Sequence, residues 1–302
     1  DPTSEITVKV GLSGVDEEGA KRNLTAEAAH WDFDRYRDEV KRQWTNALAK
    51  APIEETDPEV LANYYTALYH CYTVPNIWSD VDGRYRGEDK QIHTAQGYRR
   101  YTVFSLWDTF RAYHPLMSEL EPERTRDWIM TFLEIYKERG ELPVWELAGN
   151  ETYCMIGYHS VPVIYDAYMR GIRDFDHGLA LKAMVNSARG PQDEKKRYAE
   201  LGIVPAQEFS ESVSKTLEFA YDDWCIAQFA KEIGNYEIYE EFIVRAQSWK
   251  HLFDPTSGFM RPRRNGGFPE PFDAYQVDFN YTEANAWQYF WTPAQYDIEG
   301  MQ

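Results

Sequence analysis

Two kinds of helical stretch alternate along most of this chain, and this alternation restricts the possible folds more than any other feature. Stretches of the first kind are apolar or aromatic on nearly every face, as expected for enclosed helices; they are residues 101–113, 151–170 and 212–233. Stretches of the second kind carry one charged face, as outer helices do; they are residues 122–138, 176–187 and 236–251. This order predicts helical hairpins that form two concentric rings, a helical toroid.

The loops of such a toroid indicate where a ligand would bind. The longer loops come before the inner helices, so they lie at one end of the ring and line a central pocket. The sequence contains about eight toroid helices, whereas a closed ring of six hairpins needs twelve. We therefore expect a mainly α-helical fold with an incomplete (α/α)6 toroid.

The residues before the toroid predict two further elements. Ile6–Ser13 alternates apolar and polar residues, which indicates a β-strand. Because one strand is not stable alone, we expect it to be the last strand of an upstream sheet. The spacing of Trp31, Tyr36, Val40 and Trp44 is helical and predicts a connecting helix from about Glu27 to Ala49.

Composition excludes some classes of partner. The net charge is −18, and no basic stripe is available to meet phosphates, so we expect no nucleic-acid binding. No run of about 18 apolar residues is present, so we expect no membrane span. Aromatic residues make up 16% of the chain, an excess that is common where glycans are bound. An acidic chain of this kind is consistent with a secreted or periplasmic hydrolase.

One carboxylate stands out as a candidate acid. Residues 279–291 hold only Glu283 as a carboxylate, among six aromatic side chains. Rings around a carboxyl group exclude water, which raises its pKa and suits a general acid near neutral pH. Aromatic faces also stack on the C–H faces of sugars. In the alternative interpretation, Thr282 caps the N-terminus of a helix and Glu283 lies in its first turn.

A second motif lies in residues 105–116. Trp107, Asp108 and Arg111 fall within one predicted helical turn. Asp108 and Arg111 are three residues apart, so they would form an ordinary ion pair in a helix. A tryptophan beside an aspartate would instead hold a sugar ring, with the carboxylate accepting hydroxyl hydrogens. Local pattern leaves both interpretations open.

Further carboxylates lie on or near the predicted inner helices. Glu151 either serves the N-terminus of an inner helix, with Asn150 as the cap, or faces the pocket. Asp222 and Asp223 are adjacent in another inner helix and point about 100° apart, so at most one faces a given partner. Burying either requires a counter-charge, for which Arg111 is a structural candidate. His159 is expected to be a hydrogen-bonded core histidine.

Five blocks of the chain together resemble the calcium-dependent, inverting exo-α-mannosidases of glycoside hydrolase family 92. In this sequence they read YYTALYHCYTVPNIWSDVDGRYRG, YTVFSLWDTFRAYHPL, LPVWELAGNETYCMIGYHSVPVIYDAYMRGI, KTLEFAYDDWCIAQFA and YTEANAWQYFW. The resemblance implies a β-sandwich packed on an (α/α)6 barrel, with the active site between them. It divides the chain into the end of the sandwich (1–22), a linker helix (23–50) and a partial barrel (51–302).

The resemblance also implies roles for single residues. Glu283 corresponds to the general acid, and Trp107 with Asp108 corresponds to a sugar-contacting block. We expect Glu151, Asp222 and Asp223, which lie in matching blocks, to bind substrate as well, although the resemblance assigns them no individual role. Where the family usually has a glycine after the acid, this chain has Ala284.

The resemblance implies that the cofactor is Ca2+ and that the chain is partial. In the family, segments like HGNEPSHH and GNEDCGQMSAW supply most calcium ligands and the general base, and neither occurs in residues 1–302. We therefore expect no metal ligand set in this chain. We expect the rest of the same enzyme, or a second chain, to complete the barrel.

The implied substrates are glycans of the N-glycan or mannan type that end in α-linked mannose. The implied location is secreted or periplasmic, with anchoring to the cell surface through an upstream segment as an option. Two other classes of function remain open: a non-catalytic glycan-binding or structural helical module, and another helical-toroid enzyme such as a different glycosidase or a polysaccharide lyase.

Overall fold

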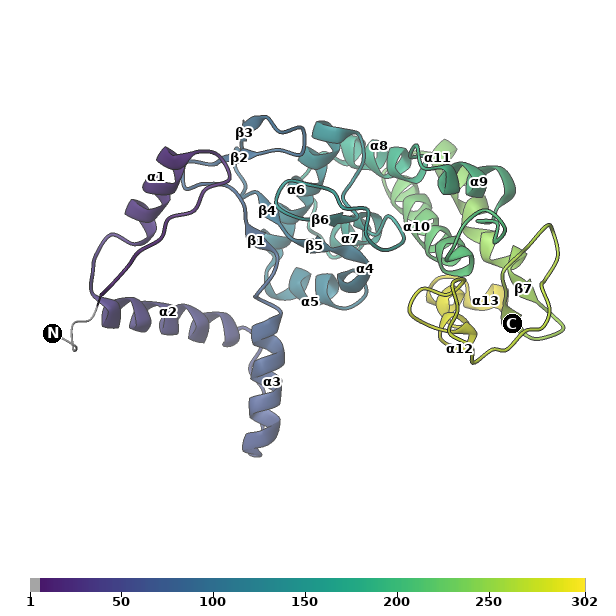
Figure 1. Cartoon of the computed structure of the whole chain (residues 1–302), viewed down its shortest axis with the longest axis horizontal. Helices are drawn as coiled ribbons and strands as arrows, with labels where there is room; N and C mark the ends of the chain where they lie inside the picture. Colours follow the sequence, from purple (N-terminus) through teal and green to yellow (C-terminus); the bar gives the residue numbers. More distant parts are fainter. Residues whose placement is uncertain (1–5, 302) are drawn as a thin grey trace.

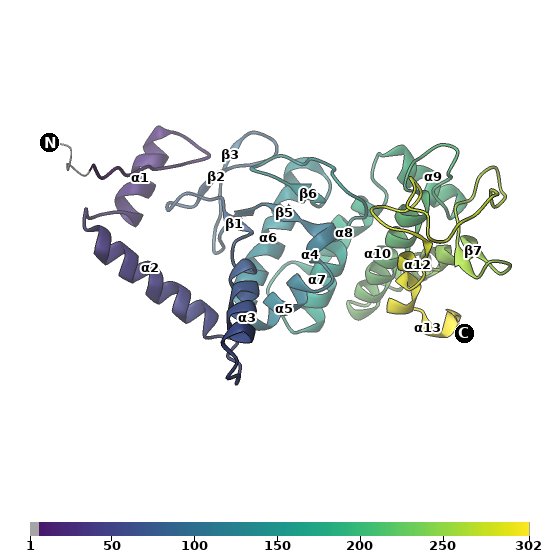
Figure 2. The same ribbon diagram turned by 60° about the horizontal axis from the view of Figure 1, so that its bottom comes forward.

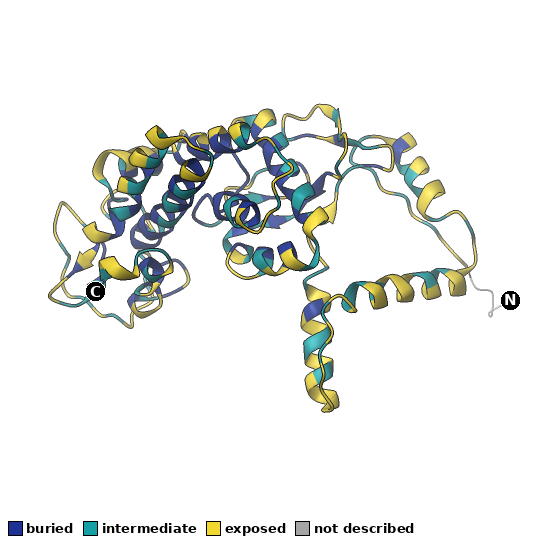
Figure 3. Ribbon diagram, turned by 180° about the vertical axis from the view of Figure 1, so that it is seen from behind, coloured by how far each residue is buried: buried dark blue, intermediate teal, exposed yellow. Residues whose placement is uncertain are grey.

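The computed structural model describes residues 6–301 and shows a helical body with an open arm on its N-terminal side (Figure 1). The arm contains α1 (Glu17–Glu27), α2 (Phe33–Leu48) and α3 (Pro58–His70). Each of these helices begins after an aspartate, Asp16, Asp32 or Asp57, whose side chain accepts a backbone N–H of the first turn. Most of the arm's surface is exposed, whereas the buried residues gather in the body (Figure 3).

Three helical hairpins form the body. They pair α5 (Tyr113–Leu120) with α6 (Pro122–Arg139), α7 (Ser160–Met169) with α8 (His177–Ala188), and α10 (Ser212–Glu232) with α11 (Tyr236–Arg245), which continues as the 3-10 helix η1 (Ala246–His251). α10 packs against α7, α8 and α11 and is buried on most faces. α11 buries only Phe242. The predicted contrast between an enclosed and an outer helix is confirmed for α10 and α11, whereas α6 and α8, which were predicted as outer helices, each bury a whole apolar face.

The remaining elements are short. They include α4 (Leu106–Thr109), α9 (Asp193–Leu201), α12 (Ala286–Tyr289), the 3-10 helix η2 (Thr292–Gln295) and α13 (Ile298–Met301). Within residues 6–301, eight strands form four antiparallel pairs: β1 (Asn76–Ile77) with β4 (Tyr101–Thr102), β2 (Arg84–Arg86) with β3 (Ile92–Thr94), β5 (Phe104–Ser105) with β6 (Trp145–Glu146), and β7 (Phe253–Asp254) with β8 (Phe259–Met260). In the third pair, Phe104 lies opposite Glu146.

Two clusters of buried apolar side chains hold the body together. The larger lies among α5, α6, α7, α8 and α10. The smaller joins the start of α10, through Val213 and Leu217, to Met260, Tyr281 and Tyr289. The C-terminal segment, drawn in yellow, therefore lies beside α10, as both ribbon views show (Figure 1, Figure 2).

Two predicted inner helices are much shorter than expected. Residues 101–113 form two short strands and the four-residue α4, and residues 151–159 form no helix. The backbone angle φ is +68° at Val103, +51° at Tyr153 and +69° at Met155. A right-handed helix cannot contain such values, so the apolar composition of these stretches reflects burial in irregular structure.

The predicted strand at Ile6–Ser13 is not formed. This stretch pairs with no strand among the described residues, and Ile6, Val8, Val10 and Leu12 are all at least 73% exposed. A strand requires a hydrogen-bonded neighbour, and none is present here. α1 was not predicted, and residues 1–5 lie outside the described range. α2 forms only the later part of the predicted connecting helix, because residues 28–32, which include Trp31, are not helical.

The fold class is otherwise as predicted. The chain is mainly helical, and its hairpins do not close into a ring within residues 6–301. None of the helices in that range combines the length and the apolar content required to cross a lipid bilayer.

Candidate active site

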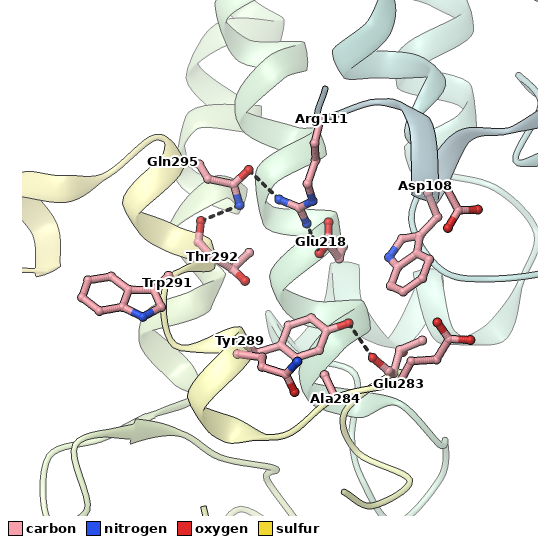
Figure 4. Close-up of a pocket in the computed structure, with 12 residues that line it drawn as sticks. Asp108, Arg111, Glu218, Glu283, Ala284, Tyr289, Trp291, Thr292 and Gln295 are labelled. Carbon is pink, nitrogen blue, oxygen red and sulfur yellow. Dashed lines mark hydrogen bonds and ion pairs between the residues drawn. The ribbon is translucent and has the colours of Figure 1, made fainter. Parts of the chain in front are cut away.

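A cavity of about 630 Å³ lies where α4, α10 and the C-terminal segment meet (Figure 4). Its walls include three of the residues predicted from sequence, Trp107, Asp108 and Glu283. The other lining residues are Arg111, Glu218, Thr282, Ala284, Gln288, Tyr289, Trp291, Thr292 and Gln295. Side chains from distant parts of the sequence, such as Arg111 and Gln295, which are 184 positions apart, therefore meet around one cavity.

Glu283 is held in an uncommon backbone conformation, with φ at +52°. The residue before it, Thr282, is buried and tied down on three sides: its N–H donates to Ser214 Oγ (2.6 Å), its hydroxyl donates to Glu211 Oε1 (2.9 Å), and its carbonyl accepts from the Tyr289 hydroxyl (3.1 Å). Positive φ in a non-glycine residue persists only where the surroundings impose it, and such residues cluster at functional sites.

The carboxyl group of Glu283 is exposed at the cavity and forms no hydrogen bond or ion pair with any residue in the range 6–301. Figure 4 shows it on the same side of the cavity as Asp108. We expected aromatic rings to exclude water from this carboxyl group. That expectation is wrong, because the rings within residues 6–301 leave Glu283 exposed. Ala284, which follows it, is only 8% exposed and packs in the smaller core cluster.

The alternative interpretation of Glu283 as a first-turn helix residue is also wrong. The helix α12 begins later, at Ala286. Its N-cap is Asn285, whose side chain accepts the Gln288 N–H, while the Gln288 side chain accepts the Asn285 N–H. This capping box satisfies two of the free N–H donors at the start of the helix without Thr282 or Glu283.

Trp107 and Asp108 lie on α4, which directly follows the strand β5. The Asp108 carboxylate accepts a hydrogen bond from the Ser105 hydroxyl. The predicted ion pair with Arg111 is not formed, because the chain leaves the helix after Thr109 and the Arg111 guanidinium turns to other partners. Asp108 therefore remains exposed at the cavity beside Trp107.

Glu218 is a cavity residue that sequence reasoning missed. Its side chain is 1% exposed, and its Oε1 accepts from Arg111 Nη2 at 2.5 Å. Burial raises the pKa of this carboxyl group, against the attraction of His159 and Arg111, which lowers it. One signal was available in the sequence: Glu218 precedes Asp222 by four residues, so the two carboxylates share one face of a helix.

Asp222 and Asp223 are not brought to the cavity. Asp222 is fully buried and accepts from the Tyr158 N–H (2.8 Å) and from His159 Nδ1 (2.8 Å). His159 is therefore a hydrogen-bonded core histidine, as predicted. Arg111, suggested as the counter-charge for this pair of aspartates, binds Glu218 instead.

Asp223 is also fully buried and has its own set of hydrogen-bond donors. Its carboxylate accepts from the hydroxyls of Tyr158 (2.6 Å) and Tyr198 (3.1 Å) and from Arg245 Nε (2.9 Å). Burial raises its pKa, and Arg245 opposes the rise. With every oxygen occupied inside the protein, Asp223 supports the helix packing and has no free position for a ligand.

Glu151 likewise lies away from the cavity. Its carboxylate accepts from the backbone N–H groups of Val144 (2.8 Å), Trp145 (2.9 Å) and Tyr153 (2.8 Å). Arg139 Nη2 lies 3.3 Å from the same carboxylate. The predicted substrate-binding role of Glu151 therefore finds no support in this geometry, since the side chain organises the loop before α7.

No group of three or more His, Cys, Asp or Glu side chains in residues 6–301 is arranged to hold a metal ion. Glu283 and Asp108 reach the cavity as single carboxylates beside Glu218, which is already bound by Arg111. The residues present therefore do not provide a complete calcium site, and we assign no step of a reaction to calcium bound by them.

The chain matches the glycosyl hydrolase family 92 catalytic domain over residues 19–302. A family GH92 α-mannosidase from Bacteroides thetaiotaomicron superposes with a TM-score of 0.91 at 38% identity, covering 96% of this chain and 39% of that one. A second structure of that enzyme contains mannoimidazole. A family GH92 inverting mannosidase from the same species has a TM-score of 0.90 at 32% identity, covering 96% of this chain and 40% of its own.

A curated relative from the fungus Arthroderma benhamiae bears the name uncharacterized secreted glycosidase. It is 24% identical to this chain, and the match covers 87% of this chain and 34% of the relative. The chain thus spans about two fifths of the solved relatives and about one third of the curated one. Since the family match extends over nearly all of the sequence, the chain belongs to glycosyl hydrolase family 92.

Proposed function

We propose that this chain forms the acid-donating part of an exo-α-mannosidase, which removes terminal α-linked mannose from glycans with inversion. The observation that carries the proposal is that Glu283, Trp107 and Asp108 meet at one open cavity. Further support comes from the 38% identical relative, which is named an α-mannosidase and of which a second structure contains mannoimidazole.

Each of the three side chains has a chemical role in this proposal. Glu283 donates a proton to the departing glycosidic oxygen, which requires a carboxyl group that no protein group already occupies. Trp107 offers a ring face for the C–H face of the sugar, and Asp108 accepts hydrogens from sugar hydroxyls. The contacts of Thr282 hold the backbone beside Glu283, which limits the part of the cavity that the carboxyl group can reach.

Inversion requires a second carboxylate on the opposite side of the sugar. The two carboxyl groups of an inverting glycosidase lie about 6.5–9.5 Å apart, which leaves room for the attacking water. We propose that sequence outside this chain supplies that base. Inversion is supported by one of the relatives, which is named a family GH92 inverting mannosidase.

We propose Ca2+ as the cofactor of the complete enzyme, bound mostly by residues outside this chain. We also propose a secreted or periplasmic location, which the name of the Arthroderma benhamiae relative supports. The substrates that fit the proposal are N-glycans or mannans, and the rest of the enzyme or a second chain completes the barrel.

A panel of glycosides given to the full-length protein tests this proposal. We expect hydrolysis of aryl α-mannosides but not of aryl β-glycosides or uronate polymers. Because the reaction inverts, NMR at early times should show β-mannose as the first product. Hydrolysis of a different class, cleavage of uronate polymers, or α-mannose as the first product would contradict the proposal.

The 302-residue chain by itself gives a second test. Since the proposal places the base elsewhere, we expect the purified chain to release no mannose from the aryl α-mannosides that the full-length protein hydrolyses. Turnover by the isolated chain would show that it contains its own base and would overturn that assignment.

A further inference from the structure

A buried line of titratable groups runs behind the cavity wall from Asp222 to Glu218. His159 joins them: its Nδ1 lies 2.8 Å from Asp222 Oδ1 and its Nε2 lies 3.3 Å from Glu218 Oε2. All three side chains are at most 1% exposed. The ring of Phe110 stacks on His159 at 4.0 Å, so the imidazole is fixed in its plane.

The hydrogen-bonding chemistry of this line determines where protons must lie. An ionised carboxylate only accepts, so His159 Nδ1 must carry the hydrogen that faces Asp222. A neutral imidazole would then turn the lone pair of Nε2 toward Glu218 Oε2, and two acceptors would face each other. Neither of these two buried atoms has another hydrogen-bond partner among the described residues. One additional proton is therefore required between them.

Counting charges supports this additional proton. Two arrangements balance the charges: imidazolium His159 with ionised Glu218, or neutral His159 with protonated Glu218. The ion pair of Arg111 with Glu218 Oε1 favours the ionised carboxylate, and the first arrangement then puts the proton on His159 Nε2. Without the proton, a net negative charge would remain in a site that water does not reach, which is costly. Tyr289 and Tyr296 also face Glu218, but burial raises the pKa of Tyr289 to about 12 and that of Tyr296 further, so both remain neutral.

Arg111 connects the buried line to the cavity. Its Nη2 donates to Glu218 Oε1 at 2.5 Å and its Nη1 donates to Gln295 Oε1 at 2.6 Å. The guanidinium lies over the Phe110 ring, 4.5 Å from its centroid. Figure 4 shows Arg111 between Gln295 and Glu218 at the upper wall of the cavity. Its side chain is 41% exposed, so N–H groups remain available there.

We propose that Asp222, His159 and Glu218 form a relay that retains one proton on His159 Nε2 and thereby holds Arg111 in place as a donor to sugar hydroxyl oxygens. His159 and Glu218 are positioning residues, since they act through Arg111. This role for Arg111 rests on the proposed function, whereas the position of the proton does not. The ligand class is a neutral hexopyranose, because the guanidinium is already paired with a carboxylate.

The test uses the full-length protein labelled with 15N-histidine, studied by NMR near neutral pH. Both ring nitrogens of His159 should be protonated in the native protein. In Glu218→Gln the introduced amide can donate to Nε2, so the imidazole no longer needs the proton and Nε2 should become unprotonated. An unprotonated Nε2 in the native protein, or no change in Glu218→Gln, would overturn the relay.

A matched control is Glu138→Gln. Glu138 is also a buried glutamate paired with an arginine, at 2.9 Å from Arg100 Nη2, and it lies outside the cavity. It should leave the His159 signals unchanged. If both variants shift the signals equally, the effect is a general disturbance of the fold and the relay is contradicted.

Kinetics on aryl α-mannosides test the part that depends on the proposed function. A lost hydrogen bond to a charged group costs about 1.5–3 kcal/mol, so Glu218→Gln and Arg111→Lys should each raise KM about tenfold or more, with a smaller change in kcat. Glu138→Gln should not raise KM. An unchanged KM in both cavity variants would contradict the role of Arg111. Absence of mannoside hydrolysis in the native protein would refute the proposed function and leave the NMR result to decide the relay.

Discussion

Glu283 and the acidic residues of α10 are the same kind of chemical group in opposite surroundings. Asp222 and Asp223 lie within a long regular helix, are fully buried, and have hydrogen-bond donors around their oxygens. Glu283 lies outside any helix. Its φ is +52°, and its carboxyl group is exposed at the cavity. Glu218 is intermediate, being buried on α10 and yet part of the cavity wall.

This difference shows that the role of a carboxylate depends more on its hydrogen-bond partners in the folded protein than on the residues beside it in the sequence. A buried carboxylate must be compensated, and once compensated it has no capacity left for a substrate. An exposed carboxylate on a rigid backbone retains that capacity. The buried carboxylates should therefore contribute to stability, and the exposed Glu283 should contribute to catalysis.

Asp223→Ala should give the largest loss of stability. It leaves Arg245, whose side chain is 15% exposed, without its partner, and such a loss costs about 3–5 kcal/mol. Hydrogen exchange of the α10 amides in the full-length protein measures the free energy of local opening. A loss below about 1 kcal/mol would mean that the buried aspartates are not structural, and the division proposed here would fail.

Glu88 extends the comparison to pH. Its side chain is 4% exposed, and burial raises its pKa to about 7 against the attraction of Arg139 at 3.0 Å. The unfolded value is about 4.3, so the folded state holds the proton more tightly. This contribution to stability is fully present below about pH 4.3 and is lost as pH rises through about 7, by about 4 kcal/mol.

The pH prediction is checked by following thermal unfolding of the full-length protein from about pH 4 to 8, with Glu88→Gln as the control. The native protein should lose stability relative to the variant as pH rises. Parallel curves would show that Glu88 does not titrate differently in the folded state.

Glu283→Gly should show the smallest effect on stability, with the opposite sign. Glycine adopts positive φ without steric cost, so relief of strain should stabilise the fold by about 0.5–1 kcal/mol. The same change removes the proton donor, so hydrolysis of mannosides with poor leaving groups should fall. A clear loss of stability in this variant would indicate that the Glu283 side chain has a structural role after all.

Elements with strong local signals were predictable from the sequence. α3 begins with Asp57 and Pro58, and α6 ends at Gly140, which has φ at +91°. α9 was not predicted, because its sequence DEKKRYAEL is mostly charged and has too few apolar positions to show a helical period. Helices were predicted wrongly at residues 101–113 and 151–159. These stretches are buried irregular structure, and such structure can be as rich in aromatic residues as an enclosed helix.

The site was predictable in part. Trp107, Asp108 and Glu283 belong to distinctive blocks, and they meet at the cavity. Glu218 was missed because its importance depends on Arg111 and His159, which lie 107 and 59 positions away in the sequence. Glu151 was assigned to the substrate because its backbone partners depend on loop conformations that no local pattern reveals.

Proton donation by Glu283 is tested most directly by Glu283→Gln in the full-length protein, assayed on α-mannosides with good and with poor leaving groups. An activated aryl leaving group needs little protonation, so its kcat/KM should change little. For a poor leaving group, such as an alkyl or sugar alcohol, kcat/KM should fall by about 10²–10⁴-fold. Equal losses for both kinds of leaving group would contradict the assignment of Glu283 as the acid.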